Sequence, residues 1–481
     1  MARVAVDIAN GFYQSFSPQL ANLECINLRP VVPESPAYSP TALRSTDGIR
    51  EFVDTGLKTS RGAIESQGIA YFVQDNAFIR LNSDGTFFNI SASQLPSPVN
   101  ITGTGLVKMA ASREYIWIVV PNGNSYYYDL NTGDLTLNLD PGFLGPALDV
   151  WFKDGFFFFN TDSIIFNSNL DGITFTPTDF GTAEVDPDLI QAGMVSNGQY
   201  YSLGTETIQP YQTIGGSGFP LSTIPTGTVE RGLAARNGAV KADNTFFFIG
   251  GGDQQEVSIW RFVGNNAIKV STPAIDHFMQ GLSDDEIRSV FAWSYQTEGE
   301  EYVGFTFFNR TFVFQIVASQ RIGRPIWFER STDGTRWRVN TVVRAYNRIF
   351  VGDERTGKIG VIDPTIYTEY GDVLNREFTT QPFNFDGSPV FANSYEMVMA
   401  SGVGNSESPN PVVNHSYSDN GINFTPTLAR DMGQKGEYGK RIVWRRMGRI
   451  ARNRVLKFQT HEPVETTFFV LEAEVFGSSA S

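Results

Sequence analysis

The chain has 481 residues, with 37 Lys and Arg against 51 Asp and Glu, which gives a formal net charge of −14. This length suits two or three domains with sizeable cores, and the acidic balance excludes a protein that coats nucleic acid, because its surface would repel phosphate. The single Cys25 excludes an intrachain disulfide, and the lack of a signal-peptide pattern or of about 18 consecutive apolar residues predicts a protein made in a reducing cytoplasm without membrane insertion.

In chain order, seven segments read as β-hairpins, each with aromatic and β-branched runs on either side of a turn. The turns are rich in Asn, Asp and Gly, which tolerate the left-handed backbone conformations that tight hairpins need. The hairpins begin near residues 70, 115, 156, 200, 246, 302 and 349, about 40 to 56 residues apart. This spacing is expected when each blade of a β-propeller contributes one four-stranded sheet, so it predicts about six or seven blades.

The four phenylalanines at 156–159 also fit a propeller. A blade is covered on both faces by its neighbours, so its strands do not need to alternate polar and apolar residues. We expect the ring to close by pairing an early strand with the last blade, which removes exposed sheet edges. Two stacked β-sandwiches are the alternative architecture with the same spacing.

One short helix is predicted over 283–293. Ser283 is a capping residue and Glu286 stands three positions later, which is the pattern of a capping box. The consecutive acids Asp284, Asp285 and Glu286 complement the positive end of the helix dipole. We therefore interpret them as structural rather than as a catalytic carboxylate pair.

After Pro364 the sequence changes character. Strand-like runs now flank a loop rich in Gly, Ser, Asn and Pro at 401–411, which is typical of a second β domain with a long exposed turn. We divide the chain into an extended N-terminal segment at 1–50 that joins the propeller, a β-propeller at 51–368 and a β-sandwich-like domain at 369–481. The predicted fold class is all-β.

Two stretches are alike, NLDGITFTP at 169–177 and SDNGINFTP at 418–426. The second contains D-x-G-x-x-F, close to the turn of sialidase-type propellers, in which an aspartate caps the backbone amides of a hairpin and a glycine takes a positive φ. We interpret both stretches as structural hairpin turns.

The sequence offers no spacing of residues that suits a catalytic, cofactor or metal site. The histidines His277, His415 and His461 are scattered, so no zinc-ligand pattern arises, and we interpret each as a surface or hydrogen-bonded residue. The glycine clusters lie between strands rather than before a helix, which excludes a phosphate-binding loop. We predict a protein without enzymatic activity, cofactor or metal. The alternative is a propeller glycosidase or sugar-binding protein that acts on host surface polysaccharide.

Positive charge gathers near the C-terminal end. Residues 435–457 hold nine Lys and Arg and one acid, so this stretch carries +8 while the remainder carries −22. Strand alternation places Trp444, an expected core anchor, and Arg446 on one face, with Arg441 and Arg445 on the other. The candidate protein-interface residues are Arg441, Arg445, Arg446, Arg449, Arg452 and Arg454. Three interpretations stay open: a solvated strand face, a surface that docks on a partner protein, and direct contact with DNA.

Several regions resemble one known protein family. The segments are KADNTFFFIGGGDQQEVSIWRF at 241–262 with PAIDHFMQGLSDDEI at 273–287, YSDNGINF at 417–424, KRIVWRRMGRI at 440–450 and, at the start, CINLRPVVPESP at 25–36. They are similar to segments of the packaged-DNA stabilisation proteins, or tail hub proteins, of short-tailed bacteriophages. The motif around Trp444 is the most specific of these matches.

The resemblance implies a structural protein of the virion tail, built from a propeller with an added β domain. The family implies a hexameric ring of copies below the portal and adaptor, which holds a tail needle or tip, contacts tail fibre or spike proteins, and keeps packaged DNA from leaking through the ejection conduit. It also implies transient, non-specific contact with double-stranded DNA, and synthesis in the host bacterial cytoplasm. An acidic wall would let the duplex slide, because each avoided Lys or Arg contact removes an attraction to phosphate, and the basic stretch would serve docking.

Overall fold

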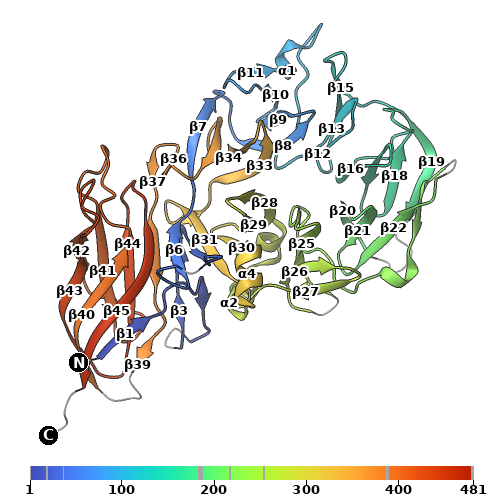
Figure 1. Cartoon of the computed structure of the whole chain (residues 1–481). Coiled ribbons are helices and arrows are strands. Elements are labelled where there is room, and N and C mark those ends of the chain that lie inside the picture. Colours follow the sequence, from blue (N-terminus) through green and yellow to red (C-terminus); the bar gives the residue numbers. More distant parts are fainter. Residues whose placement is uncertain are drawn as a thin grey trace.

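The computed structural model describes residues 2–17, 20–35, 37–182, 188–215, 218–252, 255–384 and 389–477. Figure 1 shows two bodies, a ring of small β-sheets and a β-sandwich beside it that contains the C-terminal strands. The fold is therefore all-β, a propeller followed by a sandwich, which confirms the predicted fold class.

Seven sheets form the blades of the ring within these described ranges. Blades 1 and 2 are β8 (Ser60–Ser66), β9 (Ile69–Gln74), β10 (Ala77–Leu81) and β11 (Phe87–Asn89), then β12 (Lys108–Ala111), β13 (Tyr115–Val119), β14 (Ser125–Asp129) and β15 (Leu135–Leu137). Blades 3 and 4 are β16 (Asp149–Lys153), β17 (Phe156–Asn160), β18 (Ile164–Ser168) and β19 (Phe175–Thr182), then β20 (Ile190–Ser196), β21 (Gln199–Gly204), β22 (Ile208–Thr213) and β23 (Leu221–Thr223).

The remaining three blades complete the ring. Blade 5 is β24 (Ala239–Ala242), β25 (Thr245–Gly250), β26 (Ser258–Val263) and β27 (Asn266–Lys269). Blade 6 is β28 (Phe291–Thr297), β29 (Glu300–Thr306), β30 (Thr311–Gln315) and β31 (Trp327–Thr332), from which β32 (Thr335–Arg336) turns back. Blade 7 is β33 (Val339–Ala345), β34 (Arg348–Asp353), β35 (Lys358–Asp363) and β7 (Gly48–Asp54). The seven predicted hairpins are the second and third strands of these blades.

Two-residue turns join the first and second strands of most blades. In blade 3, for example, Asp154 and Gly155 have φ values of 50° and 85°, and in blade 5 Asp243 and Asn244 have 49° and 54°. Positive φ at both positions gives the turn a twist that matches the right-handed twist of the flanking strands. The Asn, Asp and Gly content of the sequence therefore reflects a repeated local requirement of the fold.

An early strand closes the ring. Strand β7 pairs antiparallel with β35, with Ile49 opposite Ile362. The first strands of neighbouring blades contact one another around the ring, including β33 with β8, while Tyr201 and Phe246 pack blade 4 against blade 5. The predicted closure by an early strand is confirmed, and the alternative of two stacked sandwiches is wrong.

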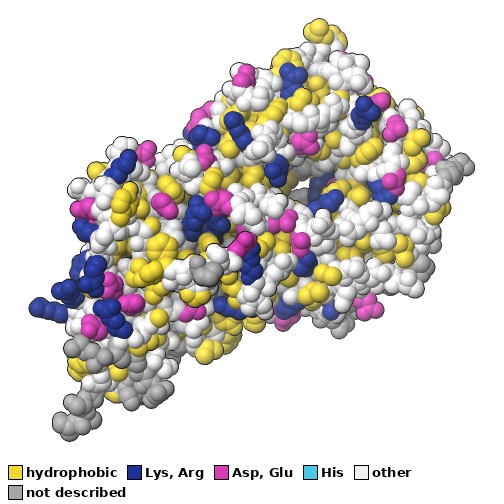
Figure 2. All heavy atoms as spheres, viewed as in Figure 1, with side chains coloured by type: hydrophobic (Ala, Val, Ile, Leu, Met, Phe, Trp, Pro, Cys, Tyr) yellow, Lys and Arg dark blue, Asp and Glu magenta, His cyan; other side chains and the backbone are white. Residues whose placement is uncertain are grey.

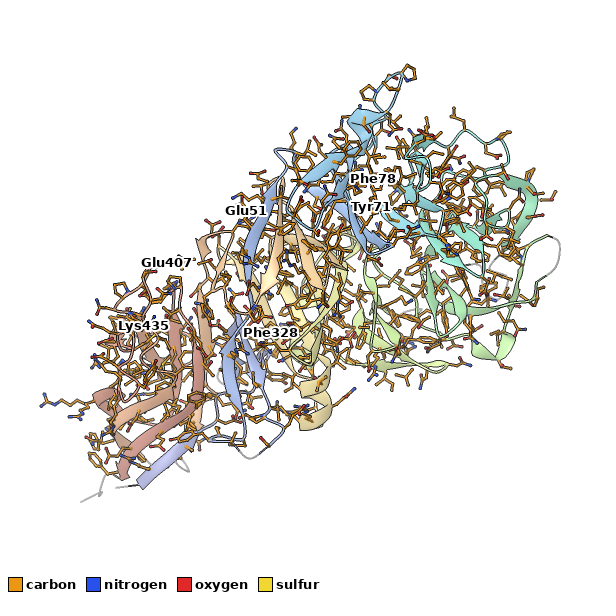
Figure 3. The ribbon with its side chains drawn as sticks, turned by 45° about the horizontal axis from the view of Figure 1, so that its top comes forward. Glu51, Tyr71, Phe78, Phe328, Glu407 and Lys435 are labelled. Atoms are coloured by element: carbon orange, nitrogen blue, oxygen red, sulfur yellow. The ribbon has the colours of Figure 1, made fainter. Side chains whose placement is uncertain are left out.

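Aromatic layers fill the spaces between blades. In blade 3, Phe159 packs edge-on against Trp117 of blade 2 with ring centroids 5.0 Å apart, whereas Phe158 faces Tyr200 of blade 4 at 5.5 Å. Figure 3 shows Tyr71 and Phe78 in the same kind of layer, where their rings stack at 5.6 Å. Both faces of a blade are thus buried, which explains the unbroken phenylalanine run.

Helices are short and few in the described part of the chain. They are α1 (Ile90–Ser93), the 3-10 turn η1 (Pro225–Gly227), α2 (Pro273–Gln280), α3 (Asp284–Arg288) and α4 (Ile316–Ile322). The predicted capping box of Ser283 and Glu286 is present in α3, but the helix ends at Arg288 because β28 begins at Phe291. No helix among the described residues is long and apolar enough to cross a membrane.

The sandwich has two sheets. One has the order β43 (Ile442–Ile450), β40 (Val390–Met399), β45 (Thr467–Gly477), β6 (Ala42–Ser45) and β5 (Leu28–Val31), and β1 (Ala2–Val6) also pairs with β45. The other contains β42 (Leu428–Asp431), β41 (Val412–Ser418), β44 (Asn453–Thr460) and β38 (Arg376–Thr379), with β39 (Phe383–Asn384) beside β44. The N-terminal residues thus contribute strands to the sandwich as well as to blade 7.

A continuous sheet joins the two bodies. Strand β4 (Cys25–Ile26) lies between β31 of blade 6 and β38 of the sandwich, and hydrogen bonds run across all three. We call these three strands the seam. Shorter strands border it: β2 (Tyr13–Gln14) pairs with β3 (Asn22–Leu23), and β36 (Thr368–Glu369) pairs with β37 (Asp372–Val373) and β7.

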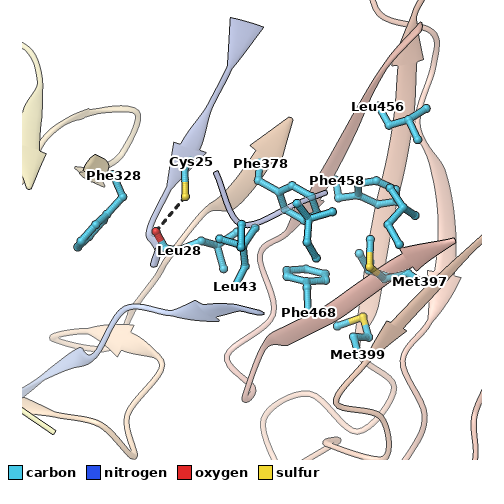
Figure 4. Packing of buried hydrophobic residues seen from close by; sticks show 14 of the residues in the cluster. Cys25, Leu28, Leu43, Phe328, Phe378, Met397, Met399, Leu456, Phe458 and Phe468 are labelled. Atoms are coloured by element: carbon cyan, nitrogen blue, oxygen red, sulfur yellow. Dashed lines mark hydrogen bonds between the residues drawn. The ribbon is translucent and has the colours of Figure 1, made fainter. Parts of the chain in front are cut away.

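The core beside the seam is apolar. Figure 4 shows Phe378, Phe458 and Phe468 packed together, with ring centroids of Phe378 and Phe468 5.0 Å apart. The buried Cys25 thiol donates to the Leu28 carbonyl at 3.2 Å. Such dense packing on both sides of β4 favours a rigid connection between propeller and sandwich.

Charged groups at and beside the seam are buried and hydrogen-bonded. The guanidinium of Arg330 lies 3.3 Å from the Glu369 carboxylate, and neither side chain is exposed. Glu369 also accepts hydrogen bonds from Trp337 Nε1 at 2.6 Å and Thr332 Oγ1 at 2.7 Å. Nearby, Arg376 donates to the backbone carbonyls of Glu462 and Tyr367, at 2.8 and 2.7 Å.

Candidate docking surface on the C-terminal domain

Strand β43 carries the basic stretch and lies at the edge of its sheet. Ile442, Trp444, Met447 and Ile450 are buried, so one face of the strand belongs to the core of the sandwich. The side chains on the other face are exposed. Figure 2 shows Lys and Arg side chains gathered at this outer edge of the molecule.

A bulge breaks the alternation of β43. Between the positions where Arg445 and Gly448 pair with β40, β43 contains one residue more than its partner. Arg446 takes a φ of 60° there, and Met447 enters the core in its place. The prediction that Arg446 shares a face with Trp444 is therefore wrong, because a bulge residue resets the two-residue period.

The six candidate arginines fall into three groups. Four of them are exposed, and within the described residues their side chains make no ion pair or hydrogen bond: Arg445, Arg446, Arg449 and Arg452. Arg441 is exposed but forms a bidentate ion pair with Glu396, in which two guanidinium nitrogens lie 2.7 and 2.6 Å from the two carboxylate oxygens. Arg454 is buried, so its side chain is not on this surface.

Arg454 supports the domain from within. Its guanidinium contacts the Asp419 carboxylate at 2.6 Å, donates to the Met447 carbonyl at 2.6 Å, and lies 3.9 Å above the Tyr417 ring. Arg454 belongs to β44, which follows the turn after β43. The direction of its side chain is therefore set by β44 and not by the alternation of β43. One basic run in the sequence thus contains both internal and external arginines.

The SDNGINF turn supplies the partner of Arg454. Asn420 Oδ1 accepts hydrogen bonds from the amides of Ile422 and Asn423, at 2.9 and 2.8 Å, and Gly421 has a φ of 75°. The stretch is a structural hairpin turn, as predicted. The capping side chain is Asn420, however, and the carboxylate of Asp419 is occupied by Arg454.

Beneath the exposed arginines lies an aromatic layer. Trp444 is fully buried, and its Nε1 donates to the Leu428 carbonyl at 2.7 Å, which confirms its expected role as a core anchor. His415 stacks on Phe458 with ring centroids 4.6 Å apart. Its Nδ1 lies 3.1 Å from the Lys457 carbonyl, while Nε2 has no partner among the described residues.

The environment of His415 disfavours its charged form. Burial in this apolar layer lowers the pKa of His415 to about 4, because a protonated ring would lose its hydration without gaining a second acceptor. His415 is therefore an internal neutral residue rather than a surface histidine.

Two exposed aromatic side chains extend the surface. Phe391 of β40 stands opposite both Arg449 of β43 and Phe476 of β45. The two phenylalanine rings stack at 5.7 Å, and 38% and 42% of these residues remain exposed. Neither residue is among the predicted interface residues, although strand alternation along 390–399 places Phe391 outward. We define the docking surface as Arg445, Arg446, Arg449, Arg452, Phe391 and Phe476.

The propeller offers a cavity but no catalytic constellation. A cavity of about 600 Å³ borders blades 1 and 7, and neither His nor Cys lines it. Its Glu354 carboxylate is paired with Arg336 at 2.5 Å. Across the described ranges, no group of three or more His, Cys, Asp or Glu is placed to hold a metal ion.

Several solved structures match part of the chain at low sequence identity. A computationally designed protein, Ika8, is 14% identical over 65% of this chain and 99% of its own, with a TM-score of 0.36. U3-55K is 11% identical over 66% and 98%, with a TM-score of 0.41, and YCF48 bound to D1 peptide is 11% identical over 69% and 99%, with a TM-score of 0.40. No curated protein sequence matches this chain.

Two family models match the chain, one for each body of the structure. The first, described as the β-propeller of bacteriophage P22 Gp10, matches residues 4–367. The second, described as the β-sandwich of bacteriophage P22 Gp10, matches residues 375–476. Together they agree with the resemblance seen in the sequence, and the chain belongs to the Gp10 family of bacteriophage tail structural proteins that stabilise packaged DNA.

Proposed function

We propose that copies of this chain form a ring below the portal and adaptor of a short-tailed phage, where the ring holds the tail tip or needle, retains packaged DNA and forms part of the ejection conduit. The observation that carries this proposal is the pair of matches to both domains of a phage tail protein. A ring must present surfaces to its neighbours, and the docking surface is the candidate for one of them.

The docking surface has the composition of a protein contact. Arginine and aromatic residues are enriched in protein interfaces, because they bury a large area and a guanidinium can form several hydrogen bonds at once. Four of the arginines have no acid of their own chain to pair with in the described structure. A partner that supplies carboxylates would form charge-assisted hydrogen bonds with them.

The charge of the remaining chain supports a conduit for DNA. Outside residues 435–457 the chain carries −22. An acidic wall repels the phosphates of the duplex and so lowers the friction of its passage. Salt screens this repulsion, so the duplex touches the wall only transiently.

Particles assembled without this protein provide the test. Purified protein added before the DNA escapes should increase the amount of DNA that these particles retain, measured as DNA protected from nuclease. Protein that binds such particles without protecting their DNA would contradict the retention role, and protein that does not bind them would contradict the tail position.

We also infer that the chain has no hydrolase activity. Two acids line the propeller cavity, Glu354 and Asp75, and Glu354 is paired with Arg336. Asp75 is then the one acid of this lining without an ion pair among the described residues, whereas a glycosidase needs two carboxylates in defined roles. Purified protein should release no reducing sugar from host polysaccharide. Release that is abolished by a single Asp or Glu substitution would overturn this inference.

A further inference from the structure

We propose that the docking surface binds the acidic side of the propeller of a second copy of the same chain. This inference rests on the proposed ring and names the two surfaces that meet in it. The contact joins different surfaces of the two copies, so each copy uses its sandwich to bind one neighbour and its propeller to bind the other.

The negative charge of the chain is concentrated in three blades. Residues 108–230, which contain blades 2 to 4, hold 14 Asp and Glu and three bases, Lys108, Arg113 and Lys153. The ammonium of Lys153 is already paired with Asp154. This stretch carries −11, most of the net charge of −14.

Much of that charge lies on exposed turns between strands. We define the acidic rim as the exposed acids on the turns at one end of the strands of blades 2 and 3: Glu114, Asp134, Asp154 and Asp171. Apart from Asp154, none of them makes an ion pair in the described residues. Both surfaces therefore carry charge that the isolated chain leaves uncompensated.

The two surfaces cannot meet within one chain. Figure 1 shows the sandwich attached beside blades 6 and 7, whereas blades 2 to 4 lie at the far side of the ring. The continuous sheet through β4 holds the two bodies together. Only a second copy can bring an acidic rim to a docking surface, and opposite charges at opposite ends orient the copies head to tail.

Apolar groups on both sides would add affinity to this orientation. On the docking surface the stacked Phe391 and Phe476 are exposed. On the propeller, Leu170 is 63% exposed and stands next to Asp171 of the acidic rim. Such a mixture of apolar contact and charge pairs is typical of specific interfaces between proteins.

Charge reversal of the docking surface and of the acidic rim, in separate variants, tests whether the two surfaces bind each other. One variant carries Arg445→Glu and Arg449→Glu, and the other carries Asp134→Lys and Asp171→Lys. The four side chains make no hydrogen bond or ion pair in the described structure, so both variants should fold, which a melting curve checks. Each variant alone brings like charges together and should lose self-association by about a hundredfold.

A mixture of the two variants is the decisive sample. In the mixture, each reversed end meets the reversed end of the other variant, so association should return to near the wild-type level. Light scattering of the full chain in about 50 mM salt measures this, because screening is weak there. Co-expression in an infected host should likewise restore entry of both variants into particles that exclude each one alone.

The outcomes separate this inference from the proposed function. Wild-type protein that enters tails, together with single variants that also enter, would leave the tail role intact and overturn the pairing of copies. Exclusion of the arginine variant alone, with no rescue in the mixture, would assign the docking surface to a different tail protein and also overturn it. Wild-type protein that does not enter tails would contradict the proposed function itself.

Discussion

The seam and the docking surface use arginine in opposite ways. At the seam, Arg330 and Arg376 are fully buried, and each donates to several acceptors of the same chain. On the docking surface, Arg445 and Arg449 are exposed and have no partner in the described structure. A buried charge must be compensated within the fold, whereas an exposed one is hydrated and stays available to another molecule. The comparison separates arginines that hold the chain together from arginines that can bind a neighbour.

The largest effect should follow the loss of the buried carboxylate beside the seam. Glu369→Gln removes the ion-pair partner of the buried Arg330 and should lower the free energy of unfolding by about 3 to 5 kcal/mol, measured by urea denaturation. Glu407→Gln, at an exposed site labelled in Figure 3, is the matched control and should have little effect. Equal stabilities of the two variants would remove the distinction drawn at the seam.

The inner face of β43 should be almost as sensitive. Trp444→Ala removes a fully buried indole and its hydrogen bond to Leu428, and should cost about 3 to 5 kcal/mol of stability if the sandwich unfolds together with the seam. Calorimetry measures this. A small loss confined to a separate, early transition would mean that the sandwich unfolds independently of the propeller.

His415 should make stability depend on pH. Its pKa is about 4 in the folded chain and near 6.5 when unfolded, so between these values the unfolded chain binds more protons. The contribution of His415 to the free energy of unfolding should therefore be fully present above pH 6.5. It should fall as the pH drops toward 4, by up to about 3 kcal/mol. His415→Phe keeps a ring in the layer and should flatten this part of the profile. An unchanged slope would assign the pH dependence to other groups.

The smallest effect on stability should come from the docking surface, where the effect on assembly should be large. Arg445→Ser, Arg449→Ser and Arg452→Ser together should shift the melting temperature by no more than about 2 °C. The variant should enter tails poorly, and high salt should impair the wild-type protein in the same way. Arg441 is left unchanged because Glu396 already binds it.

A propeller triple provides the control for that experiment. Arg113→Ser, Arg344→Ser and Arg348→Ser change the same amount of charge at exposed sites of blades 2 and 7. This control should enter tails normally. Normal entry of both triples would support the solvated strand face as the interpretation of the basic stretch.

The propeller could be predicted from sequence because its signals are local. Each central hairpin, such as that of Phe156–Asn160 and Ile164–Ser168, is encoded by neighbouring residues and a turn between them. The repeat of this unit then implies blades, and the need to cover edges implies closure by a strand such as β7. The seam could not be predicted in this way. Its central strand has only two residues, Cys25 and Ile26, which are too few to show the alternation that indicates a strand between the two bodies.

The candidate site shows the same limit. The basic run was evident, yet the burial of Arg454 depends on Asp419 and on a strand that comes after a turn. The bulge at Arg446 depends on the register between β43 and β40, which no local pattern fixes. The Phe391 and Phe476 stack joins strands far apart in the chain, so it became visible only when the sheet was assembled.

Closure by β7 has a consequence for how the chain is made. Strand β7 leaves the ribosome about 300 residues before β35, so at about 5 to 20 residues per second it waits roughly 15 to 60 s for its partner. Strand β1 waits longer still for β45. Figure 1 shows these early strands at both the ring closure and the sandwich. During synthesis the nascent chain therefore carries unpaired strands, and a chain released before β45 has left the ribosome should be a substrate for chaperones and proteases rather than a working subunit.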